Sequence, residues 1–297
     1  MEVYFIMMRI CLVGLGKTGK EVARVLLEQK DIKLVAAVCS PNSDKKGRDL
    51  GEIINARDTG ILIESSDNLQ EVIFRSKPDM VIDFSNPEAT VRNALLFSKM
   101  KVNIVVATTG FSKLALQKLF VMTRKYHNGI VYAPNITLGV NVMMLLTNIA
   151  SNILSNYDFQ ITEVHHSKKK DSPSGTAKKI AVEIVKGLNS SGRIVAAESI
   201  PINAVRAGGV VGRHEVMIVG EEDKIEIIHE SFSRKAFAAG AIRAVKFLHK
   251  KAGFYEMADV LNLGRVLGEY AQVENNKVNK RYVLCNNKSD NKDEVAN

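Results

Sequence analysis

The sequence lacks several features that would define other classes of protein. It contains no tryptophan, and only three cysteines and six prolines among its 297 residues. No apolar run reaches the ~18 residues that a membrane-spanning helix needs, which excludes a helical membrane protein. The first eight residues are apolar, but they carry neither the basic segment nor the cleavage site of a secretory signal. We therefore expect a globular protein with no membrane partner.

The few cysteines exclude two further classes. Cys11, Cys39 and Cys285 are far apart and odd in number, and none belongs to a C-x-x-C pair. A disulfide framework and a cysteine-based metal site are both excluded by this spacing, so we predict no bound metal. Unpaired thiols are typical of a reducing compartment, and the expected location is cytoplasmic.

The formal net charge of +9 raises the question of nucleic acid binding. The basic residues are spread along the chain and are not interleaved with aromatic side chains, which argues against a nucleic acid partner. Local basic clusters are better explained by an anionic cofactor and an anionic substrate. With 46% hydrophobic and 25% charged residues, the chain is long enough for two domains with a substantial core.

A glycine-rich turn follows the first apolar segment directly. Residues 9 to 13 are typical of a buried strand, and an amphipathic helix and a second strand, Lys33 to Cys39, follow the turn. The turn has the pattern G-x-G-x-x-G and consists of Gly14, Leu15, Gly16, Lys17, Thr18 and Gly19. In this strand–turn–helix context the pattern predicts a site for the pyrophosphate of a dinucleotide, although an ordinary tight turn would look similar.

The end of the second strand indicates which dinucleotide is bound. A carboxylate there would bind the ribose 2′-hydroxyl of NAD, but Cys39 and Ser40 occupy these positions. Lys45, Lys46 and Arg48 follow within a few residues. Cations without a carboxylate favour a 2′-phosphate, so we predict NADPH as the cofactor, with NADH use left open.

Strands and helices alternate through the first half of the chain. This order predicts an α/β fold with a Rossmann-type doubly wound parallel sheet. Further strands are expected at Leu62–Ile63, Met80–Phe84, Asn103–Ala107 and Gly129–Ala133. The turns that begin at Asp83 and at Ala107 should border the nicotinamide, because ligands bind at the carboxyl ends of such strands.

A second α+β domain is expected beyond the apolar helix Val142–Leu154. Alternating segments at 160–165, 200–206, 215–219 and 224–229 predict a mixed or antiparallel sheet. We predict a dinucleotide-binding domain at 1–136, a substrate-binding and oligomerisation domain at 137–240, and a helical return to the first domain at 241–271, with its helix starting at Ala241. The polar tail 272–297 is expected to be disordered.

The segment 163–179, EVHHSKKKDSPSGTAKK, concentrates the residues suited to chemistry. An amphipathic helix is predicted to begin near Pro173. The first turn of a helix has unpartnered N–H groups and a partial positive charge, and it therefore attracts anions. Gly175 lets a ligand approach the backbone, while Ser174 and Thr176 add hydroxyl groups. A carboxylate or phosphate would bind here beside imidazoles that carry protons near neutral pH; an ordinary helix start with solvated lysines is the alternative.

These residues resemble the dihydrodipicolinate reductase family, whose motif is E-x-H-H-x-x-K-x-D-x-P-S-G-T-A. The segment Glu163–Ala177 matches it closely, and the resemblance extends in order from about Met8 to Leu263. It implies a homotetramer that transfers hydride from NAD(P)H to a cyclic imine dicarboxylate of the lysine and diaminopimelate route.

The resemblance also implies roles for individual residues. His165 would donate the proton, Lys169 would be the second catalytic group, and His166 would bind one substrate carboxylate. The other carboxylate would bind at Gly175 and Thr176, with Ser174 beside them. The residues that would line the cofactor are Ala107, Thr108, Thr109, Ala133, Pro134, Asn135 and Ile136, with Thr109 also near the substrate.

Three positions depart from the family pattern. Ala107 stands where glycine is common, Ser172 where alanine is common, and Ile136 where an aromatic residue is frequent. Ser172 and Ile136 leave open a related NAD(P)H-dependent imine reductase or amine dehydrogenase that acts on another small acid. A non-catalytic NADPH-binding regulator is the alternative from a different class. Because consecutive strand residues point to opposite faces, His165 and His166 reach one site only if the strand ends there.

Overall fold

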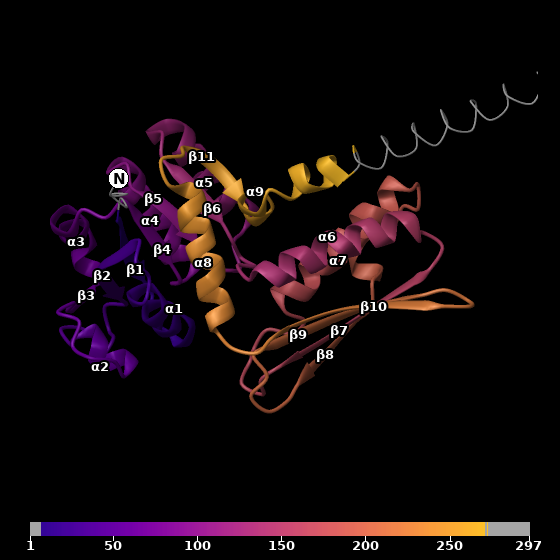
Figure 1. Ribbon diagram of the computed structural model, residues 1–297, viewed down its shortest axis with the longest axis horizontal. Helices are drawn as coiled ribbons and strands as arrows, with labels where there is room; N and C mark the ends of the chain where they lie inside the picture. The colour runs from indigo at the N-terminus through magenta and orange to yellow at the C-terminus, as the bar shows by residue number, and fades with distance from the viewer. Residues whose placement is uncertain (1–6, 271, 273–297) are drawn as a thin grey trace, which may run out of the picture. The chain divides into compact units, whose positions relative to one another are not determined.

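The computed structural model describes residues 7–270 and 272 (Figure 1). The chain divides into two compact units, Met1–Met257 and Ala258–Asn297. The first unit contains two sheets, and all the residues of the predicted site lie in it. Of the second unit the structure describes the end of α9 (Met257–Leu261) and a helical stretch at 263–270. The tail predicted at 272–297 lies outside the described residues, apart from residue 272.

The first sheet has seven parallel strands in the order β11-β6-β5-β4-β1-β2-β3. The strands are β1 (Met8–Val13), β2 (Ile32–Cys39), β3 (Ile63–Ser65), β4 (Met80–Asp83), β5 (Asn103–Val106), β6 (Gly129–Tyr132) and β11 (Gly253–Glu256). The run from β3 to β6 has the order 3-2-1-4-5-6 of a dinucleotide-binding sheet. The predicted fold class is confirmed.

Helices connect these strands and cover both faces of the sheet. They are α1 (Lys17–Leu27), α2 (Leu50–Ile54), α3 (Leu69–Ser76), α4 (Pro87–Lys99), α5 (Lys113–Tyr126) and α8 (Lys235–Leu248). Short 3-10 turns lie at Ser66–Asn68 and Ala197–Ser199. The central strands are mostly apolar because helices bury both of their faces; Val81, Ile104 and Ile130 are completely buried.

Two details at the carboxyl-terminal part of this unit differ from prediction. The helix predicted to start at Ala241 begins at Lys235, so the expected boundary between 240 and 241 falls inside α8. Gly240 does not start the helix; it allows close packing, since a Cβ there would lie 1.8 Å from the Ile136 carbonyl oxygen. Strand β11 was not predicted, because only Phe254 and Tyr255 mark it as apolar.

The second sheet has four strands in the order β10-β9-β7-β8. They are β7 (Asp158–His165), β8 (Ile202–Arg206), β9 (Gly212–Val219) and β10 (Lys224–Ser231). Strands β7 and β8 are parallel and the other pairs antiparallel, which confirms a mixed sheet. Helices α6 (Leu138–Ile153) and α7 (Gly175–Ser190) pack on one face of it around Ile161, Ile180 and Val216 (Figure 1).

The described residues bear on two further expectations. In residues 7–270 and 272, no helix is both long and apolar enough to span a membrane. Cys11 and Cys39 are buried free thiols, and Cys285 is not among the described residues.

Candidate active site

The three glycines of the first turn have three different functions. Gly14 has φ +94°, and a Cβ there would lie 2.6 Å from the backbone of Phe84. A Cβ at Gly19 would lie 1.9 Å from the Gly14 carbonyl oxygen, so this glycine brings α1 close to the turn. Gly16 faces open space and caps α1 without a side-chain bond. The turn therefore leaves backbone N–H groups beside free space at Gly16, as a pyrophosphate site requires.

A cavity of about 350 Å³ opens beside this turn. Gly14, Leu15 and Gly16 line it, together with Ser40 from the end of β2 and Ser85 and Asn86 after β4. Two cations, Lys45 and Arg92, also line the cavity. Lys46 and Arg48 do not, and Arg48 is paired with Glu52.

Buried hydrogen bonds stabilise the turn after β4. Asp83 is fully buried and its Oδ1 accepts a hydrogen bond from the Ser85 N–H at 2.8 Å. Burial raises the pKa of Asp83, against the effect of this bond. Thr108 is also buried and bonds to Thr90 at 3.3 Å. Thr108 thus helps to hold this turn in place, while Thr109 is exposed and lines neither this cavity nor the smaller one described next.

A second, smaller cavity of about 60 Å³ brings distant predicted residues together. Pro134, Asn135 and Ile136 after β6 line it, and so do His165 and Thr176. The Thr176 hydroxyl donates a 2.6 Å hydrogen bond to Asn135 Oδ1. The start of α7 therefore directly contacts the residues that follow the last central strand of the dinucleotide-binding sheet.

The start of α7 is a capped helix end with a free approach. Ser174 is the N-cap, its hydroxyl accepts the Ala177 N–H at 3.1 Å, and only 3% of its surface is exposed. Its hydroxyl is therefore already engaged in helix capping. A Cβ at Gly175 would meet no atom within 4 Å. The open approach to the N–H groups of Gly175 and Thr176 suits a carboxylate.

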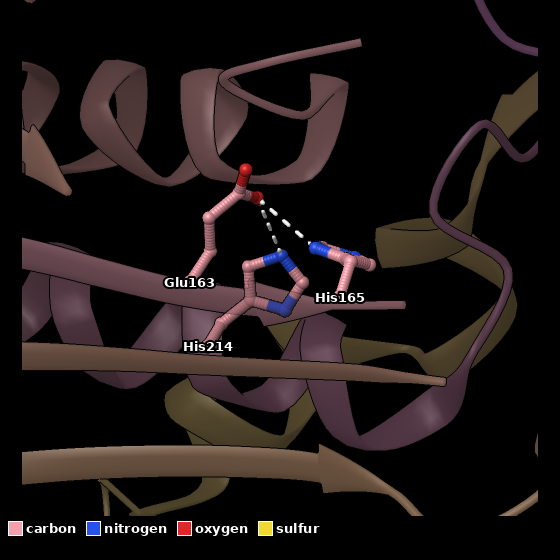
Figure 2. Close-up of side chains that lie close together, drawn as sticks. All are labelled: Glu163, His165 and His214. Atoms are coloured by element: carbon pink, nitrogen blue, oxygen red, sulfur yellow. Dashed lines mark ion pairs between the residues drawn. The ribbon is translucent and has the colours of Figure 1, made fainter. Parts of the chain in front are cut away.

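Glu163 lies at the centre of a buried charged cluster (Figure 2). Its Oε2 is 3.5 Å from His165 Nδ1 and 3.6 Å from His214 Nε2. Its Oε1 accepts hydrogen bonds from Arg206 Nη2 at 2.8 Å and from the Ser174 N–H at 2.9 Å. Burial raises the pKa of Glu163, but the nearby His214 and the hydrogen bonds from Ser174 and Arg206 outweigh burial and hold this pKa far below its usual range. Glu163 is a carboxylate at neutral pH.

Strand register explains this convergence. Glu163 and His165 are two positions apart on β7 and so face the same side of the sheet. His214 on β9 lies opposite Glu163, and Arg206 on β8 lies opposite His165. The three side chains therefore reach one carboxylate without any distortion of the strands.

His165 and His166 lie in different environments, as expected for consecutive residues at a strand end. Burial lowers the pKa of His165, the neighbouring His214 lowers it further, and Glu163 only partly opposes them, so that it is about 4. His166 is more exposed; burial, and then the charges of Lys17 and Arg234, lower its pKa. Lys169 forms an ion pair with Asp171 at 2.8 Å.

Known proteins match both parts of the chain. The family model for the dihydrodipicolinate reductase N-terminus matches residues 8–136, and that for the C-terminus matches residues 139–261. The 4-hydroxy-tetrahydrodipicolinate reductase of Methanococcus aeolicus is 36% identical over 271 residues, which cover 86% of this chain and 99% of the relative. The chain belongs to the dihydrodipicolinate reductase family. It is thus an oxidoreductase of a family that uses a nicotinamide cofactor.

Two other matches agree with this family. The reductase of Methanocaldococcus jannaschii is also 36% identical, over 88% of this chain and 99% of the relative. A solved structure of a dipicolinate-bound dihydrodipicolinate reductase from Paenisporosarcina sp. TG-14 has a TM-score of 0.69 and 26% identity. It covers 84% of this chain and 97% of the other. An amine dehydrogenase from Mycobacterium smegmatis, at 14% identity and a TM-score of 0.54 over 84% of this chain and 94% of its own, shares the fold alone.

Sequence reasoning assigned no role in this candidate site to four polar residues: Glu163, Arg206, His214 and Arg234. The spacing of Glu163 and His165 was a usable signal, because residues two apart on a strand share a face. Arg206, His214 and Arg234 are separated from His165 by 41, 49 and 69 positions. Nothing in their local sequence reports that the sheet and the start of α8 bring them to the histidines.

The Glu163, His165 and His214 ligand atoms all lie within 4.8 Å of one another, a spacing that metal sites also show. However, Arg206 already neutralises the Glu163 carboxylate, and the positive charges of Lys169 and Arg206 reach His165. This positive potential opposes a divalent cation. The arrangement fits a charged hydrogen-bonded cluster better than a metal centre.

The depressed pKa of His165 predicts acid sensitivity of this reductase. Below pH 6.5 the unfolded chain binds a proton at this histidine, whereas the folded chain does not until about pH 4. The free energy of unfolding therefore keeps its full value above pH 6.5 and falls, by about 3 kcal/mol, as the pH drops toward 4. Urea unfolding at pH 7, 5.5 and 4.5 should show a smaller loss for His165→Gln than for wild type. Equal losses would contradict a neutral, buried His165.

Proposed function

We propose that this chain reduces 4-hydroxy-tetrahydrodipicolinate with a hydride from NADPH and a proton from His165. The observation that supports this most strongly is the shared cavity. It holds His165 and Thr176 beside Asn135, which follows the last central strand of the dinucleotide-binding sheet. A proton donor, an anion-binding helix start and the edge of a cofactor site thus converge on one small space.

Different residues bind the two carboxylates of the substrate. The N–H groups of Gly175 and Thr176 bind one carboxylate of the substrate, and Lys169 and His166 bind the other. Lys17, Arg234 and Arg206 add positive potential, since their charges reach His166. The nicotinamide, when bound, supplies the hydride. The polar groups of this chain orient the ring and keep the substrate carboxylates out of bulk water.

His165 holds the proton only when the substrate is present. In the free protein its low pKa makes it neutral near pH 7. Two substrate carboxylates nearby favour the charged imidazolium and raise that pKa. His165 then carries its proton next to the acceptor atom. His165 therefore gives up its proton only while a substrate is bound.

The direct test is oxidation of NADPH by the purified chain, followed at 340 nm, with enzymatically generated 4-hydroxy-tetrahydrodipicolinate. Rapid oxidation that depends on this substrate is the expected result. Pyruvate and other simple keto acids with ammonia form the second arm. Turnover of those compounds alone would replace this proposal with an amine dehydrogenase activity, for which the 14% identical structure offers only the fold.

We propose NADPH as the preferred cofactor on the basis of the larger cavity. Lys45 and Arg92 line it with Ser40, and no carboxylate side chain is among its described lining residues. Lys45→Glu should raise the dissociation constant of NADPH about 10- to 100-fold, because a charge-assisted contact to the 2′-phosphate is replaced by repulsion. NADH binding should change little. Fluorescence titration measures both.

Lys46→Glu is the matched control for this experiment. It makes the same change of charge at the next residue, which is exposed and does not line the cavity. Equal effects of the two substitutions on NADPH would show a general electrostatic effect and would contradict a 2′-phosphate contact at Lys45.

We propose a homotetramer, supported by the face of the second sheet opposite α6 and α7. Ile227 on β10 packs toward these helices, so its neighbour Ile228 faces the other way and is 50% exposed. Light scattering should give four times the 32.7 kDa chain mass. Ile228→Glu should lower that mass by placing a charge in the interface, whereas Leu114→Glu on α5 should not. An unchanged tetramer in Ile228→Glu would place the interface elsewhere.

A cytoplasmic location is proposed for the same reductase. The supporting observation is chemical: burial raises the pKa of the Cys11 thiol to about 12, and Cys39 is a buried free thiol as well. Free thiols are typical of proteins from a reducing compartment.

A further inference from the structure

One carboxylate, that of Glu163, lies against both the proposed proton donor and the proposed substrate-binding helix start. Glu163 Oε1 accepts the backbone N–H of Ser174, the N-cap residue of the helix whose first turn would bind the substrate. Glu163 Oε2 lies 3.5 Å from Nδ1 of His165. Ser174 and His165 come from different elements and are each at least 90% buried. His214 also contacts both of them, through its ring on His165 and a 3.4 Å hydrogen bond with the Ser174 hydroxyl, but of these residues only Glu163 is acidic.

The oxygen that faces His165 is held in place but has no full hydrogen bond. Glu163 Oε2 and His165 Nδ1 are both buried, and neither forms a hydrogen bond. Arg206 and Ser174 saturate the other oxygen, Oε1. Oε2 can therefore accept a proton-bearing nitrogen, and the two that face it are His165 Nδ1 at 3.5 Å and His214 Nε2 at 3.6 Å. An acceptor-only group in this position favours the form of His165 that carries hydrogen on Nδ1.

The opposite edge of the His165 ring faces the cavity. A Cβ on Gly212 would lie 3.2 Å from His165 Nε2, and Gly212 lines the small cavity together with His165. Nε2 is thus the atom from which a proton can reach a bound substrate. Which nitrogen carries the hydrogen in the neutral ring decides whether Nε2 is free to take up and deliver it.

We propose that Glu163 is a positioning residue that selects the Nδ1–H tautomer of His165 and ties the proton donor to the substrate-binding start of α7. This inference rests on the proposed reductase function for its kinetic consequence, but its structural part does not depend on it. Glu163 stabilises the imidazolium form of His165 by its charge, and through Ser174 it holds the helix start at a set distance from that ring. His214, at 3.6 Å from the same oxygen, packs edge-to-face on His165 and keeps the ring in place.

A purely structural ion pair between Glu163 and Arg206 is the competing interpretation. It would explain the burial of both residues but would make no use of Oε2. Glu163→Gln separates the two, because the amide oxygen can still accept from Arg206 and Ser174 while the NH₂ group now faces His165. A donor in this position favours a bare Nδ1, so the neutral ring should switch to the Nε2–H tautomer.

The first measurement needs no turnover. In wild type, ¹⁵N NMR of labelled histidine should show His165 with hydrogen on Nδ1, and in Glu163→Gln with hydrogen on Nε2. Glu163→Asp keeps the charge and should keep the wild-type tautomer. Wild type already in the Nε2–H form would overturn the proposal, even if the Gln variant does not fold.

The second measurement is kinetic. Glu163→Gln should lower kcat about 100-fold or more, as expected when a buried carboxylate no longer orients a catalytic histidine, with NADPH affinity unchanged. The basic limb of the kcat profile should move to lower pH by about one unit, since the imidazolium loses its partner. Glu163→Asp should recover part of the rate. Glu183→Gln, a carboxylate on α7 paired with Lys186, should behave as wild type.

The outcomes are distinguishable. If wild type reduces the substrate and the Gln variant keeps its tautomer, rate and pH profile, Glu163 is structural and this inference is wrong. If the tautomer switches but wild type reduces no dicarboxylate imine, the proposed function fails while the positioning role of Glu163 stands.

Discussion

Replacing His165 by glutamine should lower kcat by about 10²- to 10⁴-fold, the usual contribution of a positioned general acid. Glutamine keeps a polar side chain of similar reach but cannot carry a proton near neutral pH. His165 is 7% exposed and does not line the larger cavity, so NADPH affinity should stay at the wild-type value. NADPH oxidation at saturating substrate measures the first quantity, and fluorescence titration measures the second.

Two further histidines serve as comparisons. His166→Gln should mainly raise KM, because we propose that His166 binds a substrate carboxylate together with the positive charges of Lys17 and Arg234. His249→Gln, after α8, should leave both constants unchanged. A His165→Gln variant that folds, binds NADPH and turns over as fast as wild type would contradict the assignment of His165 as the proton donor.

The second large effect is expected at Gly19. A methyl group there would lie 1.9 Å from the Gly14 carbonyl oxygen, so Gly19→Ala forces α1 away from the turn. Overpacking of backbone against backbone should cost about 3 kcal/mol of stability and weaken NADPH binding as well. Urea unfolding gives the free energy. A loss below about 0.5 kcal/mol would show that the turn relaxes without cost.

Gly16→Ala is the matched substitution in the same turn. No atom lies within 4 Å of a Cβ at this position, so the free energy of unfolding should change by less than about 0.5 kcal/mol. The methyl group would nevertheless enter the space in which a pyrophosphate approaches the backbone, and NADPH affinity should fall about tenfold or more. Wild-type affinity in Gly16→Ala would place the pyrophosphate elsewhere.

The contrast between these two glycines shows how much of this turn could be predicted from the local sequence. The spacing of the glycine motif predicted a strand–turn–helix unit, and the unit is present from β1 to α1. The separate functions of Gly16 and Gly19 were not readable from the hexapeptide. They depend on whether backbone or open space lies opposite each Cα, and this is decided by how β4 and α1 pack against the turn.

The same limit applies to the segment 163–179. Its helix start was predictable, because Ser174 and Gly175 are residue types that begin helices whatever surrounds them. Ser174 was expected to offer its hydroxyl to the substrate, but this hydroxyl caps α7 and faces the buried cluster. Capping is a local interaction, yet whether the hydroxyl is also accessible depends on what covers it.

Short-range chemistry in the sequence by itself determined the strand–turn–helix unit at the glycine motif, most of the strands and helices, and the helix start at Ser174, since each depends on residues within a few positions of one another. Only the tertiary structure decided that Arg206 and His214 meet at the buried carboxylate of Glu163, beside His165. Their encounter depends on the pairing of β7 with β8 and β9, and such register is set by contacts between distant segments, which no local pattern encodes.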